Sequence, residues 1–358
     1  MVLNIPDSEW NYKEWIKHVI ENKKDVLGSK NDNMLKIYYF HSNQAAKQEL
    51  EKNAKKQGQF HIVSMNYNES ATKNNKNTEY WMHELEPGLL MFFTSSTKEG
   101  YEKTLQQKIR KIFGLHEMWI KPDTFKRIRK DLINNKECGI TKFIGYRRKY
   151  DTNPHQAKEE AERRVHYFTD NPIDGILRLD EMEYHLGIMP KTIEYMLHSD
   201  KVEITNEGLF VLKTITQESF NLVDYVLEKI RMEEKDMREV AQGLKIEQQN
   251  IKKNTYLVLE SGRIELTEDF DENSAREIIK IFRDFAFIEP KIGVGPVLFY
   301  SDVVDKNKGS VFAINGYQKD LILIPKFEVT FETFISFYRE IVERIDEKAI
   351  LTKLSDIL

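Results

Sequence analysis

The stretch "HLGIMPKTIEYMLHSDKVEITNEGLFVLK", residues 185–213, decides the fold that the sequence predicts for the middle of the chain. Gly187 follows a helical segment, at a turn that needs a residue tolerating a positive φ. Pro190 suits the first turn of a second helix, because the N–H that proline lacks has no helical partner there. The apolar face of this second helix consists of residues three and four apart: Ile193, Met196 and Leu197.

The segments on either side complete a familiar order of elements. Upstream, Asp180 and Glu183 have the spacing of a capping box and predict the start of a helix. Downstream, Asn206 and Gly208 separate two short alternating segments, which predicts a hairpin. Over residues 172–213, the order helix, glycine turn, helix and hairpin resembles the winged helix-turn-helix superfamily.

This resemblance implies a way to contact DNA, but the local charge opposes it. In superfamily members that bind DNA, the second helix enters the major groove. Residues 171–200 hold 2 basic and 6 acidic residues, a charge of −4, and an acidic module neutralises phosphates poorly. A module that packs against flanking domains or a partner protein therefore stays an open alternative. The outward residues implied to contact DNA are Lys191, Thr192 and Tyr195, beside Glu194 and His198.

A basic segment lies upstream of this module. Residues 101–150 carry 14 Lys and Arg against 5 Asp and Glu, whereas the whole chain has a net charge of −4. A helix expected after Pro122 has a solvated basic face, and the strand expected over residues 139–150 mixes basic and aromatic residues, which suits phosphate contact and base stacking. The alternative is that these charges pair with the acidic middle of the same chain or of a second subunit. The predicted nucleic-acid contacts here are Lys126, Arg127, Arg129, Lys130, Lys142, Tyr146, Arg147, Arg148 and Lys149.

The length of 358 residues and the alternation of strand and helix signals predict a multidomain chain that combines α/β and α+β parts. An α/β domain with a basic surface is expected over residues 1–150, and an α+β domain over 267–358. The region between them, 151–266, is expected to be helical and to contain the winged helix. Within residues 235–266, three apolar residues repeat the spacing of that module and predict a second copy: Leu244, Ile246 and Ile251.

Several classes of site have no signal in the sequence. There is no phosphate-binding loop, no His-Glu-x-x-His motif and no Gly-x-Ser-x-Gly elbow. Cys138 is the only cysteine, so the chain can form no internal disulfide and no cysteine-based zinc cluster. No metal, cofactor or catalytic residue is predicted. No secretory signal or membrane span is evident either, so a cytoplasmic location without membrane contact is expected.

These patterns together favour a non-enzymatic protein that binds nucleic acid, most simply DNA. The composition, rich in Lys, Asn, Ile and Glu, is typical of AT-rich prokaryotic genomes, so a subunit of a larger prokaryotic assembly, for example in antiviral defence, is expected. Partner proteins or a homodimer are expected as well. Two alternatives remain: an adaptor that uses the winged helix as a protein interface, and a nuclease whose active site is assembled from dispersed residues.

Overall fold

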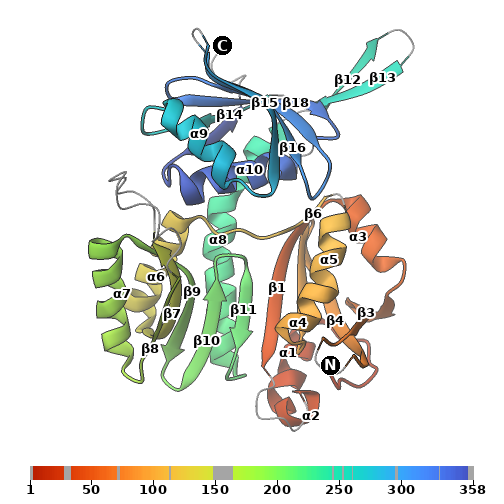
Figure 1. The fold of residues 1–358 in the computed structure, drawn as a ribbon. Helices are drawn as coiled ribbons and strands as arrows, with labels where there is room; N and C mark the ends of the chain where they lie inside the picture. Colours follow the sequence, from red (N-terminus) through yellow and green to blue (C-terminus); the bar gives the residue numbers. More distant parts are fainter. Residues whose placement is uncertain are drawn as a thin grey trace. The chain divides into compact units, whose positions relative to one another are not determined.

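The protein is described by a computed structural model, in which the chain divides into two compact units, Met1–Lys229 and Ile230–Leu358 (Figure 1). The fold is mixed α/β, and every strand pairing among the described residues is antiparallel. The structure describes residues 3–27, 34–70, 73–112, 114–147, 164–243, 246–251, 254–259, 261–294, 297–329 and 331–353.

The first unit is built on one 11-stranded sheet in the order β2-β3-β4-β5-β1-β11-β10-β9-β7-β8, with β6 paired to β1. The pairing of β1 with β11 joins residues far apart in sequence, because Lys36 lies opposite Val211. This sheet contains strands from both sides of residue 150. Its strands are β1 (Leu35–Ser42), β2 (Lys55–Gln57), β3 (Phe60–Asn68), β4 (Asn75–Glu86), β5 (Leu89–Thr94), β6 (Leu115–Glu117), β7 (Gly139–Arg147), β8 (Arg164–Phe168), β9 (Ile188–Leu197), β10 (Asp200–Thr205) and β11 (Leu209–Leu212).

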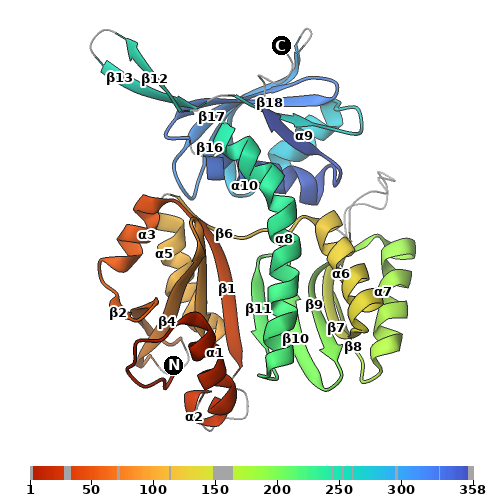
Figure 2. The ribbon, with the colours of Figure 1, turned by 180° about the vertical axis from the view of Figure 1, so that it is seen from behind.

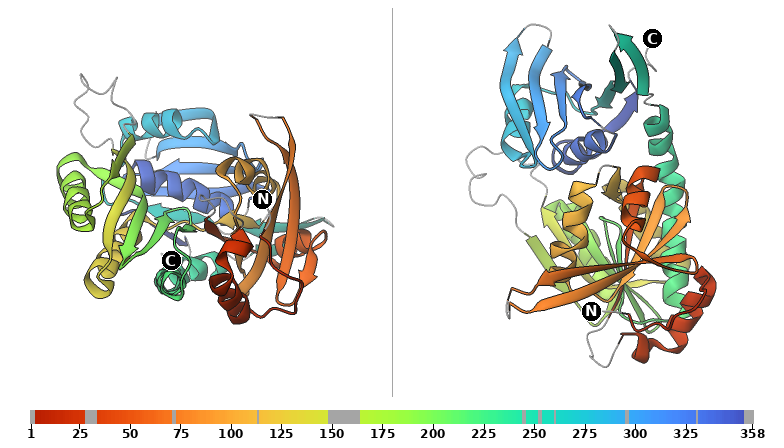
Figure 3. Two further views of the ribbon diagram at one scale, coloured as in Figure 1. Left: turned by 90° about the horizontal axis from the view of Figure 1, so that it is seen from below. Right: turned by 90° about the vertical axis from the view of Figure 1, so that its right-hand side faces the viewer.

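Helices cover the two faces of this sheet differently. On one face, α3, α4 and α5 pack over β1, β3, β4 and β5, and their apolar residues share a core with Tyr38, Phe40 and Phe92. On the other face, Trp15 of α1 contacts Phe93, and α1 and the first part of α8 lie on this same side (Figure 2; Figure 3, left). The helices are α1 (Tyr12–Glu21), α2 (Lys23–Leu27), α3 (Gln44–Glu51), α4 (Lys98–Lys103), α5 (Leu105–Lys111), α6 (Pro122–Lys136), α7 (Pro172–Leu186) and α8 (Gln217–Gly243).

The winged helix predicted over residues 172–213 is wrong at its second helix, which is the strand β9. β9 lies between β7 and β10, and both neighbours supply backbone hydrogen bonds along its length. Ile193 and Tyr195 are buried on one face, whereas Thr192 and Met196 on the other face are only partly buried. Thr192, Ile193 and Tyr195 are β-branched or aromatic, and such residues favour a strand once partners are available on both sides. The apolar spacing at Ile193, Met196 and Leu197 was therefore not the signature of a helix.

The elements that flank β9 were predicted correctly in kind. α7 ends at Gly187, which adopts a φ of 59° and caps the helix, and a hairpin joins β10 and β11 with Gly208 at a φ of 70°. The helix starts earlier than expected, because Asn171 caps it and Asp180 and Glu183 lie within it. The expectation of a helical region over 151–266 is corrected as well, since residues 164–168 form β8.

The second unit has its own sheet in the order β15-β16-β17-β18-β14-β19 and a separate two-stranded sheet. The second winged helix predicted over 235–266 is also wrong, because its residues form the end of α8, a β12–β13 hairpin and β14. Phenylalanine rings of β17 and α10 pack in the core, including Phe312 against Phe337. The elements are β12 (Ile246–Ile251), β13 (Asn254–Leu259), β14 (Gly262–Glu265), α9 (Glu272–Ile281), β15 (Phe285–Val294), β16 (Val297–Asp305), β17 (Val311–Gly316), β18 (Asp320–Phe327), α10 (Phe331–Arg344) and β19 (Ile350–Lys353).

No helix in the described part of the chain is long and apolar enough to cross a bilayer.

Candidate functional site

The basic helix α6 keeps fewer free charges than its sequence suggests, and Arg129 is the clearest case. This side chain is 1% exposed, and its guanidinium donates two hydrogen bonds to the Glu183 carboxylate of α7, at 2.5 and 2.7 Å. A third bond, of 3.2 Å, reaches Asp180. Burial disfavours the charged form of Arg129, but the hydrogen bonds and charge of Glu183 outweigh this effect and raise its pKa. Arg129 therefore holds α6 to α7 and is not available to a ligand.

Other charges of α6 are also paired within the chain. Lys126 lies 3.4 Å from Glu183, and Arg127 lies 3.3 Å from Asp123 on the same helix. Lys130 is exposed on the same helix. Lys126 and Arg129 thus follow the alternative prediction, in which the basic segment pairs with the acidic middle of the same chain.

The residues predicted on β7 and β9 separate into two groups. Tyr195 is fully buried, on the face of β9 that packs into the core, so it cannot contact a ligand in this fold. Arg148 and Lys149 lie outside the described residues, and Arg147 is the last residue of β7. The remaining four lie together on the other face of the sheet: Lys142, Tyr146, Lys191 and Thr192.

The strand register explains why these residues meet. Lys142 lies opposite Glu194 of β9 and opposite Phe168 of β8, and cross-strand neighbours point to the same face. The Lys142 ammonium is 5.7 Å from the centre of the Phe168 ring, and the Lys191 ammonium is 5.4 Å from the Tyr146 ring. Both pairs combine a cation with an aromatic surface. On β8, alternate residues share this face and are exposed: Arg164, His166 and Phe168.

Two glutamates, Glu194 and Glu203, form ion pairs with three lysines on the same face, which lie on β7, on β10 and directly after β11. Lys142 lies 2.6 Å from Glu203, and Lys213 contacts both Glu194 and Glu203. Lys201 lies 3.9 Å from Glu194. In Figure 1, β9, β10 and β11 face the viewer and α8 lies behind them. We call this surface the lysine face, and it comprises Lys36, Lys142, Arg164, Lys191, Lys201, Lys213, Glu194, Glu203, Tyr146 and Phe168.

The lysine face keeps an excess of positive charge in spite of its ion pairs. It has six basic and two acidic side chains, a formal charge of +4. Burial opposes ionisation of Glu194, but hydrogen bonds from Lys213 and Thr141 outweigh it and hold the pKa of this carboxyl below its usual range. Burial lowers the pKa of Lys36, which donates to the Ser96 carbonyl oxygen at the edge of this face. The surface therefore suits an anion with spaced charges.

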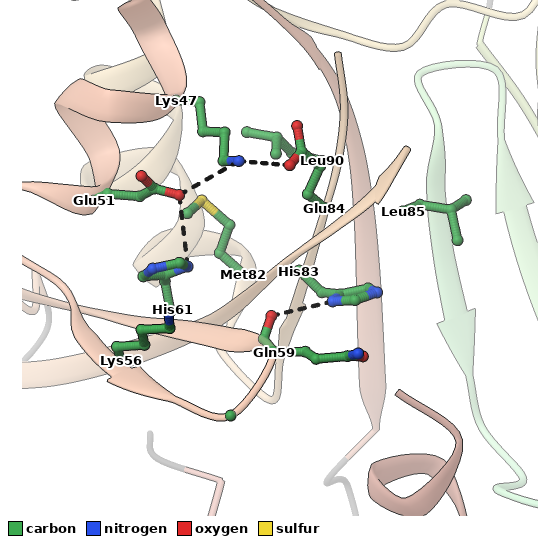
Figure 4. Close-up of a pocket in the computed structure, with 11 residues that line it drawn as sticks. Lys47, Glu51, Lys56, Gln59, His61, Met82, His83, Glu84, Leu85 and Leu90 are labelled. Carbon is green, nitrogen blue, oxygen red and sulfur yellow. Dashed lines mark hydrogen bonds and ion pairs between the residues drawn. The ribbon is translucent and has the colours of Figure 1, made fainter. Parts of the chain in front are cut away.

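A pocket of about 540 Å³ lies at the opposite end of the sheet, beside α3 and β3 (Figure 4). Its polar side chains form a short chain of contacts, in which Lys47 lies 2.5 Å from Glu84 and 3.7 Å from Glu51. Glu51 lies 3.7 Å from His61. Burial lowers the pKa of His61, because it disfavours the imidazolium. His83 lies in the same pocket, donates to the Gln59 carbonyl oxygen when its Nδ1 carries the proton, and stacks on Tyr12.

The evidence for a functional site is weaker at this pocket than on the lysine face. The described residues that line it include no Ser, Thr or Cys, so a nucleophile with His61 as its base is not assembled there. The carboxylates of Glu51 and Glu84 are balanced by Lys47, which contacts both, and by Lys56, which also lines the pocket, so little net charge is left for a ligand. No set of three His, Cys, Asp or Glu residues in the described ranges is arranged to bind a metal.

The sequence patterns did not indicate four of the six basic residues of the lysine face: Lys36, Arg164, Lys201 and Lys213. Arg164 and Phe168 lie in the region that was expected to be helical, and Lys201 and Lys213 lie within the predicted winged helix, 172–213, without being named as contacts. A signal was present in "KVEIT" of β10, because strict alternation puts Lys201 and Glu203 on the same face of a strand. The pairing of β7 with both β8 and β9, which assembles the face, is a long-range property that local patterns do not contain.

No protein-family model matches the chain, and comparison with curated proteins and with solved structures finds no significant similarity.

Proposed function

We propose that this protein binds single-stranded nucleic acid on the lysine face of its first unit. The observation that carries the proposal is the convergence of basic and aromatic side chains from β1, β7, β8, β9 and β10 on one sheet face. Phosphates attract the ammonium and guanidinium groups, and the rings of Tyr146 and Phe168 offer surfaces on which bases can stack. DNA and RNA both satisfy this chemistry.

The geometry favours a single strand over a double helix. The helix that was expected to enter a major groove is the strand β9, so the proposed contact no longer depends on groove reading. A sheet face with exposed aromatic rings is typical of surfaces on which unpaired bases lie flat. Phe168 is 65% exposed, so one face of its ring is open to a base.

The two glutamates have a positioning role in this proposal. Glu194 and Glu203 are themselves nearly buried, with side chains 6% and 15% exposed, and they fix Lys142 and Lys213 against the sheet. Lysines held in this way lose less rotamer freedom when a phosphate approaches. Lys201 and Arg164 are more exposed, and they would make the outer phosphate contacts.

The electrostatic part of the proposal is tested by charge reversal. A fluorescently labelled single-stranded oligonucleotide is titrated with the wild type and with Lys201→Glu, Arg164→Glu and their combination, at several salt concentrations. Each lost phosphate contact should lower the slope of log affinity against log salt by about 0.7, and the affinity should fall with it. Lys17→Glu is the matched control, because Lys17 is 75% exposed on α1, away from the lysine face.

The aromatic part is tested separately. Phe168→Ala should weaken binding by about 1–3 kcal/mol without changing the salt slope, because it removes stacking and no charge. Phe168→Tyr should restore most of the affinity. If the charge-reversed variants bind like Lys17→Glu and Phe168→Ala binds like the wild type, the lysine face is not a nucleic-acid surface.

A further inference from the structure

Helix α7 carries an apolar row on the side that faces away from the sheet. Ile173, Leu177 and Tyr184 are 66%, 63% and 86% exposed. They lie four and seven residues apart, a spacing that puts them in one line along a helix. The opposite side of α7 is buried through Gly175 and Leu179 against β7, so this row is not needed to attach the helix.

Carboxylates flank the row on both sides. Asp180 lies on one side of the row, and Glu181 and Asp174 lie on the other, as the 3.6-residue repeat of the helix requires. All three residues are exposed. α7 contains one arginine, Arg178, and no lysine. The Arg178 guanidinium lies 2.5 Å from the Glu181 carboxylate. The helix also has a fourth acidic residue, Glu183, which is paired with Arg129 and Lys126 of α6, and Asp180 accepts a further hydrogen bond from Arg129. The exposed charged side chains of α7 are therefore three carboxylates and Arg178, a formal charge of −2.

We propose that this row, with its acidic flanks, docks a basic amphipathic helix of a partner protein. Apolar side chains of the partner would cover Ile173, Leu177 and Tyr184, and its Lys or Arg residues would meet Asp174, Asp180 and Glu181. Grooves and rows of this kind bind helices through anchors at helical spacing, and complementary charge sets the choice of partner. The proposal concerns a different surface and a different partner from the nucleic-acid proposal.

The charge of α7 favours a basic helix of a partner protein over a second copy of the chain as the binding partner. Two copies of α7 packed row to row would bring the exposed carboxylates of both helices together, and like charges at an interface disfavour association. A basic helix would gain from the same carboxylates. Burial of the row would also remove three large apolar side chains from water, which stabilises the complex.

Two designed peptides serve as the probes. Each has about 18 residues, enough to form a helix, and the same leucine row; one carries Lys at the flanking positions and the other carries Glu. Binding to the full-length protein is measured by anisotropy, at low salt and at physiological salt. The Lys peptide should bind about tenfold or more tightly than the Glu peptide, with a preference that weakens as salt rises.

Variants then locate the contact on α7. Leu177→Ala with Tyr184→Ala should weaken binding of the Lys peptide about tenfold or more. Met232→Ala is the matched control, because Met232 is an apolar side chain of similar exposure, 67%, outside α7. Asp174→Lys with Glu181→Lys should reverse the preference toward the Glu peptide. These positions are exposed, so far-ultraviolet circular dichroism should be unchanged in every variant.

Three results would overturn the proposal. The first is equal binding of the two peptides, or no binding of either. The second is unchanged binding by the Leu177→Ala, Tyr184→Ala variant. The third is a wild-type dimer in sedimentation that dissociates when Leu177 and Tyr184 are replaced, because the row would then be the contact between two copies.

Discussion

Tyr195 is a residue whose environment in the structure differs from the one that its sequence pattern predicted. The sequence placed it on the exposed face of a recognition helix, whereas the strand β9 buries it completely. Its hydroxyl group has no hydrogen-bond partner in the described part of the chain, and burial raises its pKa well above the usual range. The ring therefore stabilises the core, and the hydroxyl group does not.

Replacement of Tyr195 separates these two contributions. Tyr195→Ala should lower the free energy of unfolding by about 3–5 kcal/mol, as expected for removal of a large buried side chain. Tyr195→Phe should be neutral or slightly stabilising, because it removes a buried polar group that lacks a partner. Urea unfolding measures both. A change of less than about 0.5 kcal/mol in Tyr195→Ala would instead indicate a surface position.

Glu194 gives the lysine face a dependence on pH. Its pKa is held below the usual range in the folded state, so its ionised form contributes stability that is present above the unfolded-state pKa and is lost as the pH falls through the folded-state value. Glu194→Gln should therefore be less stable than the wild type at pH 7, and the difference should shrink as the pH falls below about 4.5. Urea unfolding at pH 7, 5 and 3.5 tests this. A constant difference across the series would show that ionisation of Glu194 is not involved.

At the scale of elements, Arg129 and Glu183 join two helices whose other contacts are mainly with the sheet. Arg129→Met should destabilise the protein by about 3–5 kcal/mol, because it leaves the Glu183 carboxylate without its main partner. Arg129→Met combined with Glu183→Met should recover most of this loss, because neither buried charge remains. Arg127→Met is the control at an exposed pair, where the change should stay within about 0.5 kcal/mol. A double variant as unstable as the single one would contradict this account.

Local signals predicted some elements of the middle region well and failed at one. The end of α7 at Gly187 and the turn at Gly208 depend on a backbone conformation that glycine favours, so they were visible in the sequence. β9 was missed because its residues satisfy two periodicities: Ile193, Met196 and Leu197 suit a helix, but alternation also suits a strand. The strand is favoured over the helix because β9 pairs with β7 on one side and with β10 on the other.

At the scale of the whole molecule, the chain separates into two units with their own sheets, and the lysine face belongs to the first of them. The sequence located the excess of positive charge correctly in residues 101–150, but the fold uses it in two ways. Arg129 and Lys126 of α6 are paired with α7, whereas Lys142, which is paired with Glu203, lies on the same face as basic residues 22 to 71 positions further along the chain, from Arg164 to Lys213. Only the three-dimensional arrangement distinguishes the charges that join α6 to α7 from those that lie on the lysine face.

The most direct test of the proposed function is photochemical crosslinking of the full-length protein to a single-stranded oligonucleotide that contains photoreactive pyrimidines, followed by mass spectrometry of the adducts. Bases stacked on the sheet should crosslink to residues of the lysine face, with Phe168 and Tyr146 as the principal sites. An excess of unlabelled oligonucleotide should suppress these adducts, and Phe168→Ala should reduce them. Adducts confined to α6 or to the second unit, or adducts that competitor does not suppress, would contradict the assignment of the lysine face as the nucleic-acid surface.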